Sequence, residues 1–572
     1  MGTTDKILRA LAGIALFTGA TLFILWRIPY GYGDIDECFP IATAYRLCLG
    51  DALVSEEWFL GQFSQMLMWP FVYLYLHIVG SLEGIVIASR YLYAVIIIFT
   101  GLFHFVVWKK HGYYGAMVGA VALILYAPFS LMVFAYYSIE IICFSIVLSL
   151  LMTGGGNSRL RFIFIGVFFA LSVLGDPYLA VLYFIYLGYE VAIGRNTYRW
   201  IYVTTGLSIV ALPVVACVLI RTSPQEITES LDYILNAPSH PHETLLVIVK
   251  SWIKAILMQQ QLWITPLIMS VIGCVAIGGR SLQRVCCKAR DLSCIIIVFL
   301  CAVWLCFAVS LSRCTFPDFL MFPVVFCALF IFLLLLPAIS DICDFEKKCL
   351  LCFCGAIACS FCSCAASNQD GIRISQCMVV MLVPSVVIIF NLCHKLQYGK
   401  LHRSMVVGCS VFSACLIGGL CFLRYSVVFW DGPMDNKDTR ITEGTHKGVI
   451  TSKEKATMHI QKVAEIKNIL DQYKDGRVMF TGGDTVGHII AEREFGTCSA
   501  WIDGEGRQAF EKIVAWNRLH PNKQAELIFF RKKDEELLDD LLQYGYRVCG
   551  NVLDCPVLSR VHHGVNGPEL KQ

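Results

Sequence analysis

The chain has 572 residues, a formal net charge of +3, and 57% hydrophobic against 16% charged side chains. Its mean hydropathy of +0.65 lies far above the range of soluble proteins and requires many apolar stretches long enough to cross a bilayer. The small net charge, with basic residues in short separate groups, argues against a nucleic-acid partner. The composition therefore indicates an α-helical polytopic membrane protein whose partner is the lipid bilayer.

Lys6 and Arg9 lie near the N-terminus and are followed by an apolar run to about Trp26. This run has the layout of a signal peptide, but no small-residue cleavage site follows it. We therefore expect an uncleaved signal-anchor that forms the first membrane span.

Runs of roughly 20 apolar residues predict about 13 transmembrane helices in all. Their approximate bounds are 10–27, 83–107, 113–134, 137–153, 161–175, 178–193, 200–220, 262–279, 292–312, 318–339, 349–366, 376–393 and 404–423. Basic residues gather in every second loop, on the side of the N-terminus, and the positive-inside rule assigns that side to the cytoplasm. The expected location is the plasma membrane, with the C-terminal segment outside the cytoplasm.

Two predicted outer loops are long, at residues 28–82 and 221–261. In the first, apolar residues recur at helical spacing, which predicts a helix lying in the headgroup plane. They are Trp58, Phe59, Phe63, Met66 and Leu67, with Trp69, Tyr73 and Tyr75 following. The second offers two amphipathic pieces separated by a turn rich in Pro and His. We expect these loops to form a roof over the outer ends of the spans.

The composition changes abruptly after Leu423, so we predict a membrane domain at 1–430 and a small extracytoplasmic α/β domain at 431–572. VMFTGG (478–483) and AELIFF (525–530) read as buried strands. Helical patterns accompany them at about 453–474, 505–517 and 533–543. This segment is long enough to bury a core. TGGD lacks the Lys and the third Gly of a phosphate-binding loop, and it is interpreted as a turn.

Most of the 27 cysteines lie inside apolar runs, where they act as small hydrophobic residues. Neither Cys286 and Cys287 nor the cysteines at 359–364 have a second CxxC or a His at zinc spacing. The sequence therefore does not predict a cysteine metal site. The three cysteines between residues 498 and 555 leave a disulfide on the outer side open.

Three carboxylates, Asp34, Asp36 and Glu37, lie within four residues at the outer end of the first predicted span. A solvated position at the membrane boundary is the ordinary explanation for an acid at the end of a span. Three neighbouring acids repel one another, however, unless a cation, a base or an acceptor substrate balances them. The cluster therefore predicts a functional use of at least one of these carboxylates.

This region resembles the first outer loop of the bacterial GT-C superfamily of integral membrane glycosyltransferases, which includes protein O-mannosyltransferases and aminoarabinose transferases. The matching residues are GDIDECF with its Asp-Glu pair, Arg46, the Gly50 and Asp51 pair, and EEWFLGQFSQ. Weaker similarity continues through SRYLYAV (89–95), ASNQDGIRISQCMVVMLVP (366–384) and ITEGTHKGVITS (441–452).

The resemblance implies a GT-C-like fold and a glycosyltransferase with a cytoplasmic N-terminus. Its members take a sugar from a polyprenyl-phosphate donor and transfer it to an acceptor on the outer face, which can be a protein, a lipid or a cell-envelope glycan. Such a transfer needs a carboxylate to deprotonate the acceptor hydroxyl and cations or hydrogen-bond donors to stabilise the leaving phosphate.

The resemblance assigns the catalytic base to Asp36, which matches the first acid of the family's Asp-Glu pair. Glu37 would then position the acceptor or a metal ion, and Asp34 is the alternative for either task. Asp34 and Asp36 also form a DxD motif, which binds a divalent metal in other glycosyltransferases. Mg²⁺ or Mn²⁺ held by Asp34 and Asp36 is therefore one expectation, and metal-free chemistry is the other.

Further polar residues on the predicted outer side are candidates for substrate binding. They are Glu140 at the start of the fourth span, Arg313 beside the tenth span, His240 and His242 in APSHPHE, and Arg373 in the SNQDGIRIS loop. Arginine can pair with phosphate bidentately, and histidine can contact phosphate or a metal. Each also has an ordinary interpretation as an interfacial or surface residue. Asp176, in GDPYL, is interpreted as a turn residue.

Two other classes of protein remain open. A transporter or flippase of lipid-linked or polar solutes would need ionisable groups or broken helices near the bilayer midplane. The predicted spans are mostly free of charge and the acids gather at the outer edge, which favours the enzyme. A membrane scaffold whose outer domain binds envelope glycans would function without Asp36.

Overall fold

A computed structural model shows the architecture. It describes residues 3–59, 61–153, 158–193, 199–235, 244–258, 283–310, 317–335, 344–365, 370–395, 399–428, 431–473, 476–502 and 504–561. The chain splits into two compact units. Unit 1 comprises Met1–Ile28, Arg90–Pro213 and Glu243–Met434, and unit 2 comprises Pro29–Ser89, Val214–His242 and Asp435–Gln572. The span predicted at 262–279 lies outside the described residues.

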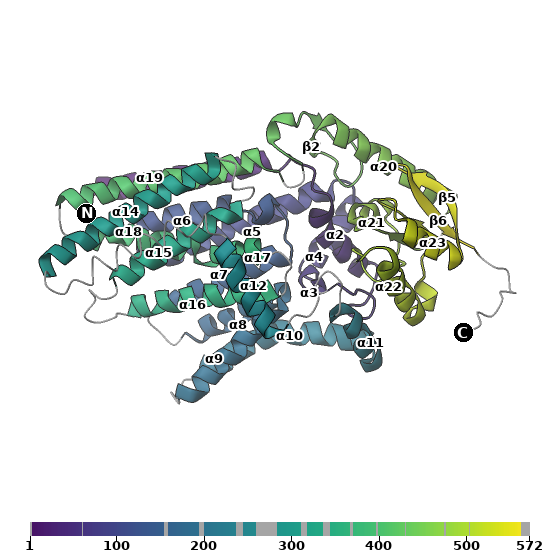
Figure 1. Cartoon of the computed structure of the whole chain (residues 1–572), viewed down its shortest axis with the longest axis horizontal. Helices are drawn as coiled ribbons and strands as arrows, with labels where there is room; N and C mark the ends of the chain where they lie inside the picture. Colours follow the sequence, from purple (N-terminus) through teal and green to yellow (C-terminus); the bar gives the residue numbers. More distant parts are fainter. Residues whose placement is uncertain are drawn as a thin grey trace. The chain divides into compact units, whose positions relative to one another are not determined.

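Unit 1 is helical, as Figure 1 shows. Its principal helices, some of which begin or end in unit 2, are α1 (Thr3–Arg27), α5 (Ile85–Trp108), α6 (Tyr113–Leu125), α7 (Tyr136–Met152), α8 (Arg159–Gly175), α9 (Ala180–Ile193), α10 (Arg199–Arg221), α12 (Leu245–Met258), α14 (Gln283–Ser310), α15 (Met321–Leu335), α16 (Asp344–Ala365), α17 (Asp370–Met378), α18 (Leu382–Lys395) and α19 (Gly399–Ser426). Short 3₁₀ turns include η1 (Pro128–Ser130), η2 (Pro177–Leu179) and η3 (Pro317–Leu320).

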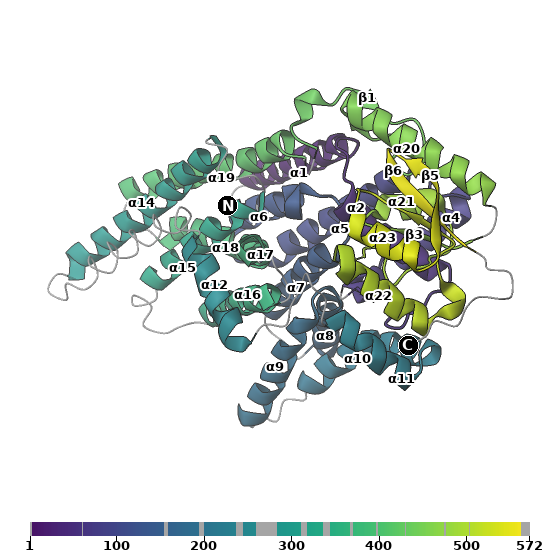
Figure 2. The same ribbon diagram turned by 45° about the vertical axis from the view of Figure 1, so that its right-hand side comes forward.

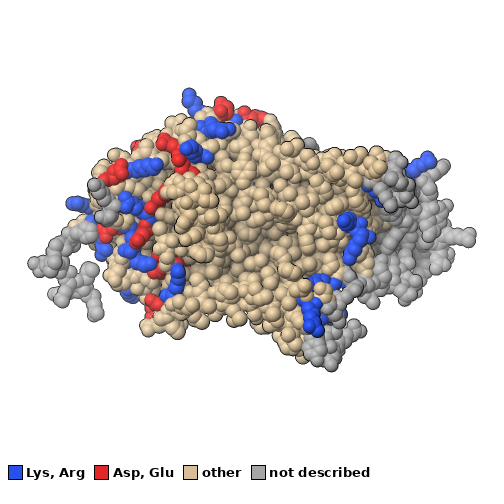
Figure 3. All heavy atoms as spheres, turned by 180° about the vertical axis from the view of Figure 1, so that it is seen from behind, with Lys and Arg blue, Asp and Glu red and all other residues tan. Residues whose placement is uncertain are grey.

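Six helices in the described part are long and apolar enough to cross a membrane. They are Ile7–Arg27, Ile85–Trp108, Arg199–Arg221, Lys348–Ala365, Ile372–Asn391 and Arg403–Ser426, and each lies where a span was predicted. Figure 3 shows one face on which a broad area carries no charged side chain, as expected of a surface in contact with lipid. The chain is therefore a multi-pass membrane protein, whereas the count of 13 spans and the side of each terminus stay predictions.

Helices α8 and α10 approach closely at two glycines. A Cβ atom added to Gly166 would lie 2.0 Å from the carbonyl oxygen of Val203, and one added to Gly206 would lie 2.0 Å from that of Ile163. Small residues let helix backbones meet in a membrane, where packing and not the hydrophobic effect drives association. The two glycines therefore set the contact between α8 and α10.

Unit 2 gathers segments that are far apart in the sequence. The first segment supplies α2 (Ile35–Cys48), α3 (Gln62–Gln65) and α4 (Trp69–Val79), and the second supplies α11 (Pro224–Leu235). The C-terminal segment supplies α20 (Lys453–Gln472), α21 (Thr485–Ala491), α22 (Gly506–Leu519), α23 (Glu535–Gln543), and the short strands β1 (Thr439–Arg440) and β2 (Ile450–Thr451). Helices α20, α22 and α23 lie where the sequence predicted helices.

A four-stranded sheet, in the order β3-β4-β6-β5, lies in the C-terminal segment. The predicted strands are β3 (Val478–Phe480) and β4 (Leu527–Phe529), which pair in parallel, and β5 (Tyr546–Val552) and β6 (Cys555–Arg560) add antiparallel pairs. Leu553 and Asp554 connect β5 to β6 with positive φ angles, as a type I′ hairpin requires. Helices α20 and α23 pack against β5 (Figure 2).

The interfacial helix predicted from Trp58 is wrong up to Leu67, whereas Trp69 and Tyr73, predicted to follow in it, lie exposed on α4. Residues 51–59 form an irregular segment, and α3 extends only over Gln62–Gln65. Trp58 is buried, and its ring stacks on Tyr233 of α11 with centroids 4.6 Å apart. The apolar spacing therefore reflects burial inside unit 2 and not a stripe facing the membrane.

Candidate functional site

The three carboxylates of the acidic stretch lie at the start of α2. Asp34 immediately precedes the helix, and Asp36 and Glu37 occupy its first turn, where the helix dipole favours negative charge. Glu37 is buried, and its carboxylate lies so close to Gly33 that a Cβ there would be 2.1 Å from Oε2. Helix formation thus holds the three acids together on one turn.

Asp34 is paired with a basic residue of the C-terminal segment. Arg531, two residues after β4, donates from Nη2 to Oδ2 of Asp34 over 2.5 Å. The other oxygen, Oδ1, is buried and has no hydrogen-bond partner among the described residues. Burial raises the pKa of Asp34, although Lys462 and Arg531 oppose this effect. A carboxylate with an increased proton affinity is suited to accept a proton.

Lys462, whose charge lowers the pKa of Asp34, forms a second ion pair within the C-terminal segment. Nζ of Lys462, in α20, lies 2.6 Å from Oδ1 of Asp484. Asp484 also caps α21 by accepting from the backbone N–H of Gly487. Burial alone would raise the pKa of Asp484, but Lys462 and the Gly487 N–H hold it below its usual value. Asp484 is therefore a fixed anion that keeps Lys462 in place.

An aromatic cluster fixes the backbone just before the acids. Tyr32 stacks on His446 with centroids 4.5 Å apart, and its hydroxyl lies 3.1 Å from Nδ1 of His459. Nε2 of His446 donates to the carbonyl oxygen of Gly33 over 2.9 Å. Burial lowers the pKa of His459 to about 4, so this ring is neutral at pH 7. Residues of the C-terminal segment thus hold the acidic stretch in position.

Sequence reasoning found the acids of this site but missed Arg531, Lys462 and Asp484. One signal pointed to Asp484 and Arg531, and none pointed to Lys462. Asp484 ends the TGGD segment that follows β3, and Arg531 follows β4, so both lie at the carboxyl ends of parallel strands, where α/β sheets commonly bind ligands. In addition, ITEGTHKGVITS, which contains His446, belonged to the weaker part of the family resemblance.

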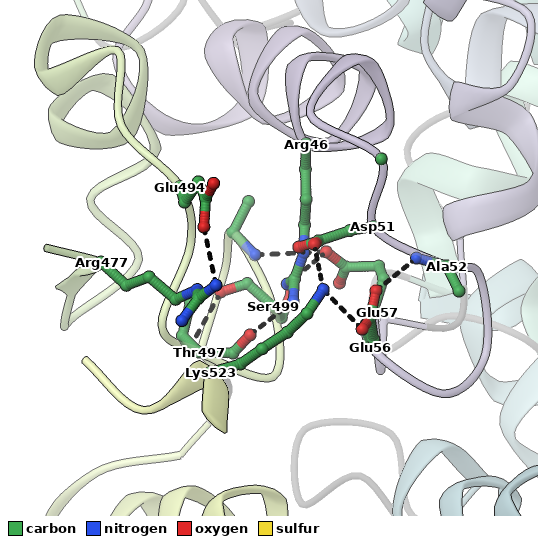
Figure 4. A network of polar contacts seen from close by, with 12 residues as sticks. Arg46, Asp51, Ala52, Glu56, Glu57, Arg477, Glu494, Thr497, Ser499 and Lys523 are labelled. Atoms are coloured by element: carbon green, nitrogen blue, oxygen red, sulfur yellow. Dashed lines mark hydrogen bonds and ion pairs between the residues drawn. The ribbon is translucent and has the colours of Figure 1, made fainter. Parts of the chain in front are cut away.

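The rest of the first-loop motif forms a separate ion network, drawn in Figure 4. Nε of the buried Arg46 donates to Oδ2 of Asp51 over 2.6 Å, and Nη1 donates to Oε2 of Glu57 over 3.2 Å. Its Nη2 donates to the carbonyl oxygen of Thr497 over 2.7 Å, and Lys523 pairs with Asp51 over 2.8 Å. Lys523 also pairs with Glu56 over 2.6 Å. These contacts join the first segment of unit 2 to the C-terminal segment, so the network has a structural role.

Glu140 and Arg373, proposed separately from the sequence, meet in unit 1. Arg373 lies in α17 and not in a loop as expected, and its Nη2 forms an ion pair with Oε2 of Glu140 in α7. Nη1 donates to Oε1 of Gln376 over 2.8 Å. Ser363 donates to Oε1 of Glu140 and lies 3.0 Å from Oδ2 of Asp176. All five side chains are buried, and Nε of Arg373 has no hydrogen-bond partner among the described residues.

Asp176 also accepts from the backbone N–H of Tyr178, which caps η2 and agrees with its interpretation as a turn residue. His240, His242 and Arg313 lie outside the described residues, so their roles stay predictions.

Unit 1 buries more ionisable groups than the predicted spans suggested. Asp318 of η3 accepts from the Tyr126 hydroxyl over 2.6 Å and from the backbone N–H of Phe129 over 3.0 Å. Arg424 of α19 is fully buried, and none of its three guanidinium nitrogens has a hydrogen-bond partner among the described residues. Buried ionisable groups of this kind in a membrane protein often serve a function.

The chain's capacity for metal binding differs between the units. Asp34 and Asp36, the predicted ligands of Mg²⁺ or Mn²⁺, lie on one helical turn, but one oxygen of Asp34 is held by Arg531. In unit 1, the ligand atoms of Glu140, Cys359 and Cys377 converge.

Neither a protein-family model nor a curated protein matches the chain. Among solved structures, the chain is similar to the crystal structure of ArnT from Cupriavidus metallidurans in the apo state, with 13% sequence identity and a TM-score of 0.43. The similarity covers 98% of this chain and 100% of that one. A similarity of this size does not assign the chain to a family.

Proposed function

We propose that this protein is a membrane glycosyltransferase that transfers a sugar from a polyprenyl-phosphate donor to an acceptor on the outer face of the membrane. The observation that carries the proposal is the approach of Arg531 and Lys462 to the acidic stretch of unit 2. Transfer from a lipid phosphate requires a proton acceptor and, close to it, cations that stabilise the phosphate as it leaves. The pairing of Arg531 with Asp34, and the effect of the Lys462 charge on the same acid, support this proposal.

In the proposed reaction, the carboxylate of Asp36 takes the proton of an acceptor hydroxyl. The acceptor oxygen attacks the anomeric carbon of the sugar, and the bond from that carbon to the phosphate oxygen breaks. The bonding electron pair leaves on the prenyl phosphate, and a single displacement inverts the anomeric configuration. Asp34 is the alternative base because burial raises its pKa.

The basic residues have a matching role. Arg531 offers guanidinium N–H donors beyond the one that Asp34 accepts, so it can bind a phosphate oxygen and keep its pairing with Asp34. Glu37 would position the acceptor. A divalent cation at Asp34 and Asp36 would add positive charge beside the phosphate, and it would have to compete with Arg531 for Asp34.

Loss of donor is the direct test. The full-length protein in lipid would be incubated with a panel of radiolabelled polyprenyl-phosphate sugars, with and without EDTA. We expect Asp36→Asn to lower the rate by at least about 100-fold, because a positioned base contributes that much to such reactions. Asp471→Asn, at an exposed position of α20, is the matched control and should retain the wild-type rate.

The other outcomes are informative. A wild-type rate in Asp36→Asn together with a loss in Asp34→Asn would move the base to Asp34. Loss of activity in EDTA would establish the cation. If no donor is consumed with any acceptor tested, that result would contradict the proposal that the protein is a glycosyltransferase.

The buried ionisable groups of unit 1 favour a second candidate, a transporter or flippase of lipid-linked or polar solutes. Glu140, Arg373 and Asp318 are the kind of buried groups that mark solute pathways through membranes. In reconstituted vesicles, translocation of a fluorescent lipid-linked sugar that needs Arg373 but not Asp36, without cleavage of the lipid, would replace the enzyme by the transporter.

A further inference from the structure

Two thiols in unit 1 face one oxygen of Glu140. Sγ of Cys359, in α16, lies 3.5 Å from Oε1 of Glu140, and Sγ of Cys377, in α17, lies 3.6 Å from the same oxygen. The three ligand atoms lie within 4.8 Å of one another, and all three side chains are completely buried. The two cysteines come from different helices, so no zinc spacing reveals them in the sequence.

The charges around these thiols do not balance. Arg373 pairs with Oε2 of Glu140, which leaves Oε1 directed toward the sulfur atoms. Asp176 shares the Ser363 hydroxyl with Glu140, and among the described residues Arg373, which pairs with Glu140, is the one base in this group of contacts. A buried excess of negative charge is costly unless a cation or a proton compensates it.

We propose that Glu140, Cys359 and Cys377 form a binding site for a divalent transition metal, with Zn²⁺ as the best chemical match. Thiolates and carboxylate oxygens are both donors that zinc accepts, whereas Mg²⁺ and Mn²⁺ prefer oxygen alone. Each thiol loses its proton to solvent when the metal binds, so binding releases up to two protons.

The site would serve a purpose apart from glycosyl transfer. Its ligands come from α7, α16 and α17, so a bound ion would fasten three helices of unit 1 together. It also differs from the cation predicted at Asp34 and Asp36, which belong to unit 2.

In the test, a chelator first strips metal from the full-length protein in detergent. The protein is then loaded with Zn²⁺, the excess is dialysed away, and the Zn²⁺ that stays bound is measured. Wild type should retain one more tightly bound Zn²⁺ per chain than either Glu140→Gln or the double variant Cys359→Ser/Cys377→Ser. The matched control is Cys306→Ser/Cys415→Ser, which removes another pair of neighbouring thiols, 3.2 Å apart, on α14 and α19. This control should bind as much Zn²⁺ as wild type.

Wild-type levels of Zn²⁺ in the Cys359→Ser/Cys377→Ser variant would show an adventitious ion only and overturn the proposal. If that variant fails to fold, X-ray absorption at the zinc edge of the wild-type protein decides. Sulfur atoms together with an oxygen in the first coordination shell support the site, and a shell of nitrogen and oxygen alone contradicts it. Neither readout depends on transferase activity, so this proposal and the proposed function can fail separately.

Discussion

Charge compensation at single residues decides where unit 2 can bury its acids. Asp34 is matched by Arg531, Asp484 by Lys462, and Glu57 by Arg46. The sequence showed that Asp34, Asp36 and Glu37 needed a balancing charge, because three acids in four residues repel one another. It did not show which bases supply that charge, since Arg531 lies almost 500 positions along the chain from Asp34.

Burial of His488 in α21 predicts a specific pH dependence. Its ring stacks on Phe495 with centroids 4.3 Å apart, and burial lowers its pKa to about 3. The unfolded chain protonates this histidine below about pH 6.5 and the folded chain does not, so stability falls as the pH drops from about 6.5 toward 3. By pH 5 the loss should reach about 2 kcal/mol.

Unfolding in detergent at pH 7 and pH 5 checks this prediction. His488→Phe keeps the aromatic contact but cannot titrate, so it should lose about 2 kcal/mol less than wild type between the two pH values. An equal loss in both proteins would show that His488 does not cause the dependence.

Removal of Arg46 should destabilise unit 2 strongly. Arg46→Ala leaves the fully buried Glu57 without its guanidinium partner, and breaking a buried ion pair in this way costs about 3–5 kcal/mol. Arg507→Ala is the control, because Arg507 pairs with Asp540 and Glu511 at the surface and its loss should not change unfolding measurably. Equal effects of the two substitutions in chemical unfolding would contradict a structural role for the Arg46 network.

At the scale of elements, the six long apolar helices of the described part lie where spans were predicted, because apolar runs of sufficient length have few other stable arrangements in lipid. The α20, α22 and α23 helices and the β3 and β4 strands were also predictable, since each has a local apolar period. The segment at 51–59 was not, because Trp58 packs on Tyr233 and Arg46 binds Glu57, and both contacts depend on tertiary structure.

The contact between α8 and α10 gives a prediction for helix packing. Gly206→Ala places a methyl group against the backbone of Ile163, so the helices must separate, and stability should fall by about 1–3 kcal/mol. Gly188→Ala in α9 is the matched control, because nothing lies within 4 Å of the added methyl group. Thermal unfolding in detergent compares the two, and a control as unstable as Gly206→Ala would refute the close contact.

At the scale of the whole molecule, composition alone predicted a multi-pass membrane protein, and the six long apolar helices of the described part agree with it. The sequence did not show which segments of the chain form unit 2. The boundary expected near residue 430 separates the C-terminal segment from the first long loop, yet the two contribute to one compact unit. The buried cluster of Leu53, Trp58, Ile234, Cys498 and Trp516 draws on all three of its segments. One sequence does not show such a cluster because its members have no local pattern.

The central claim is that the acidic stretch at 34–37 and the basic residues of the C-terminal segment form one site. The rate of donor loss in Arg531→Gln tests this most directly. We predict a rate about 100-fold below wild type, as for removal of one stabilising donor from an active site, with partial activity in Arg531→Lys. The control Arg547→Gln, at an exposed position of β5, should act as wild type. Donor loss at the wild-type rate in Arg531→Gln would contradict the account.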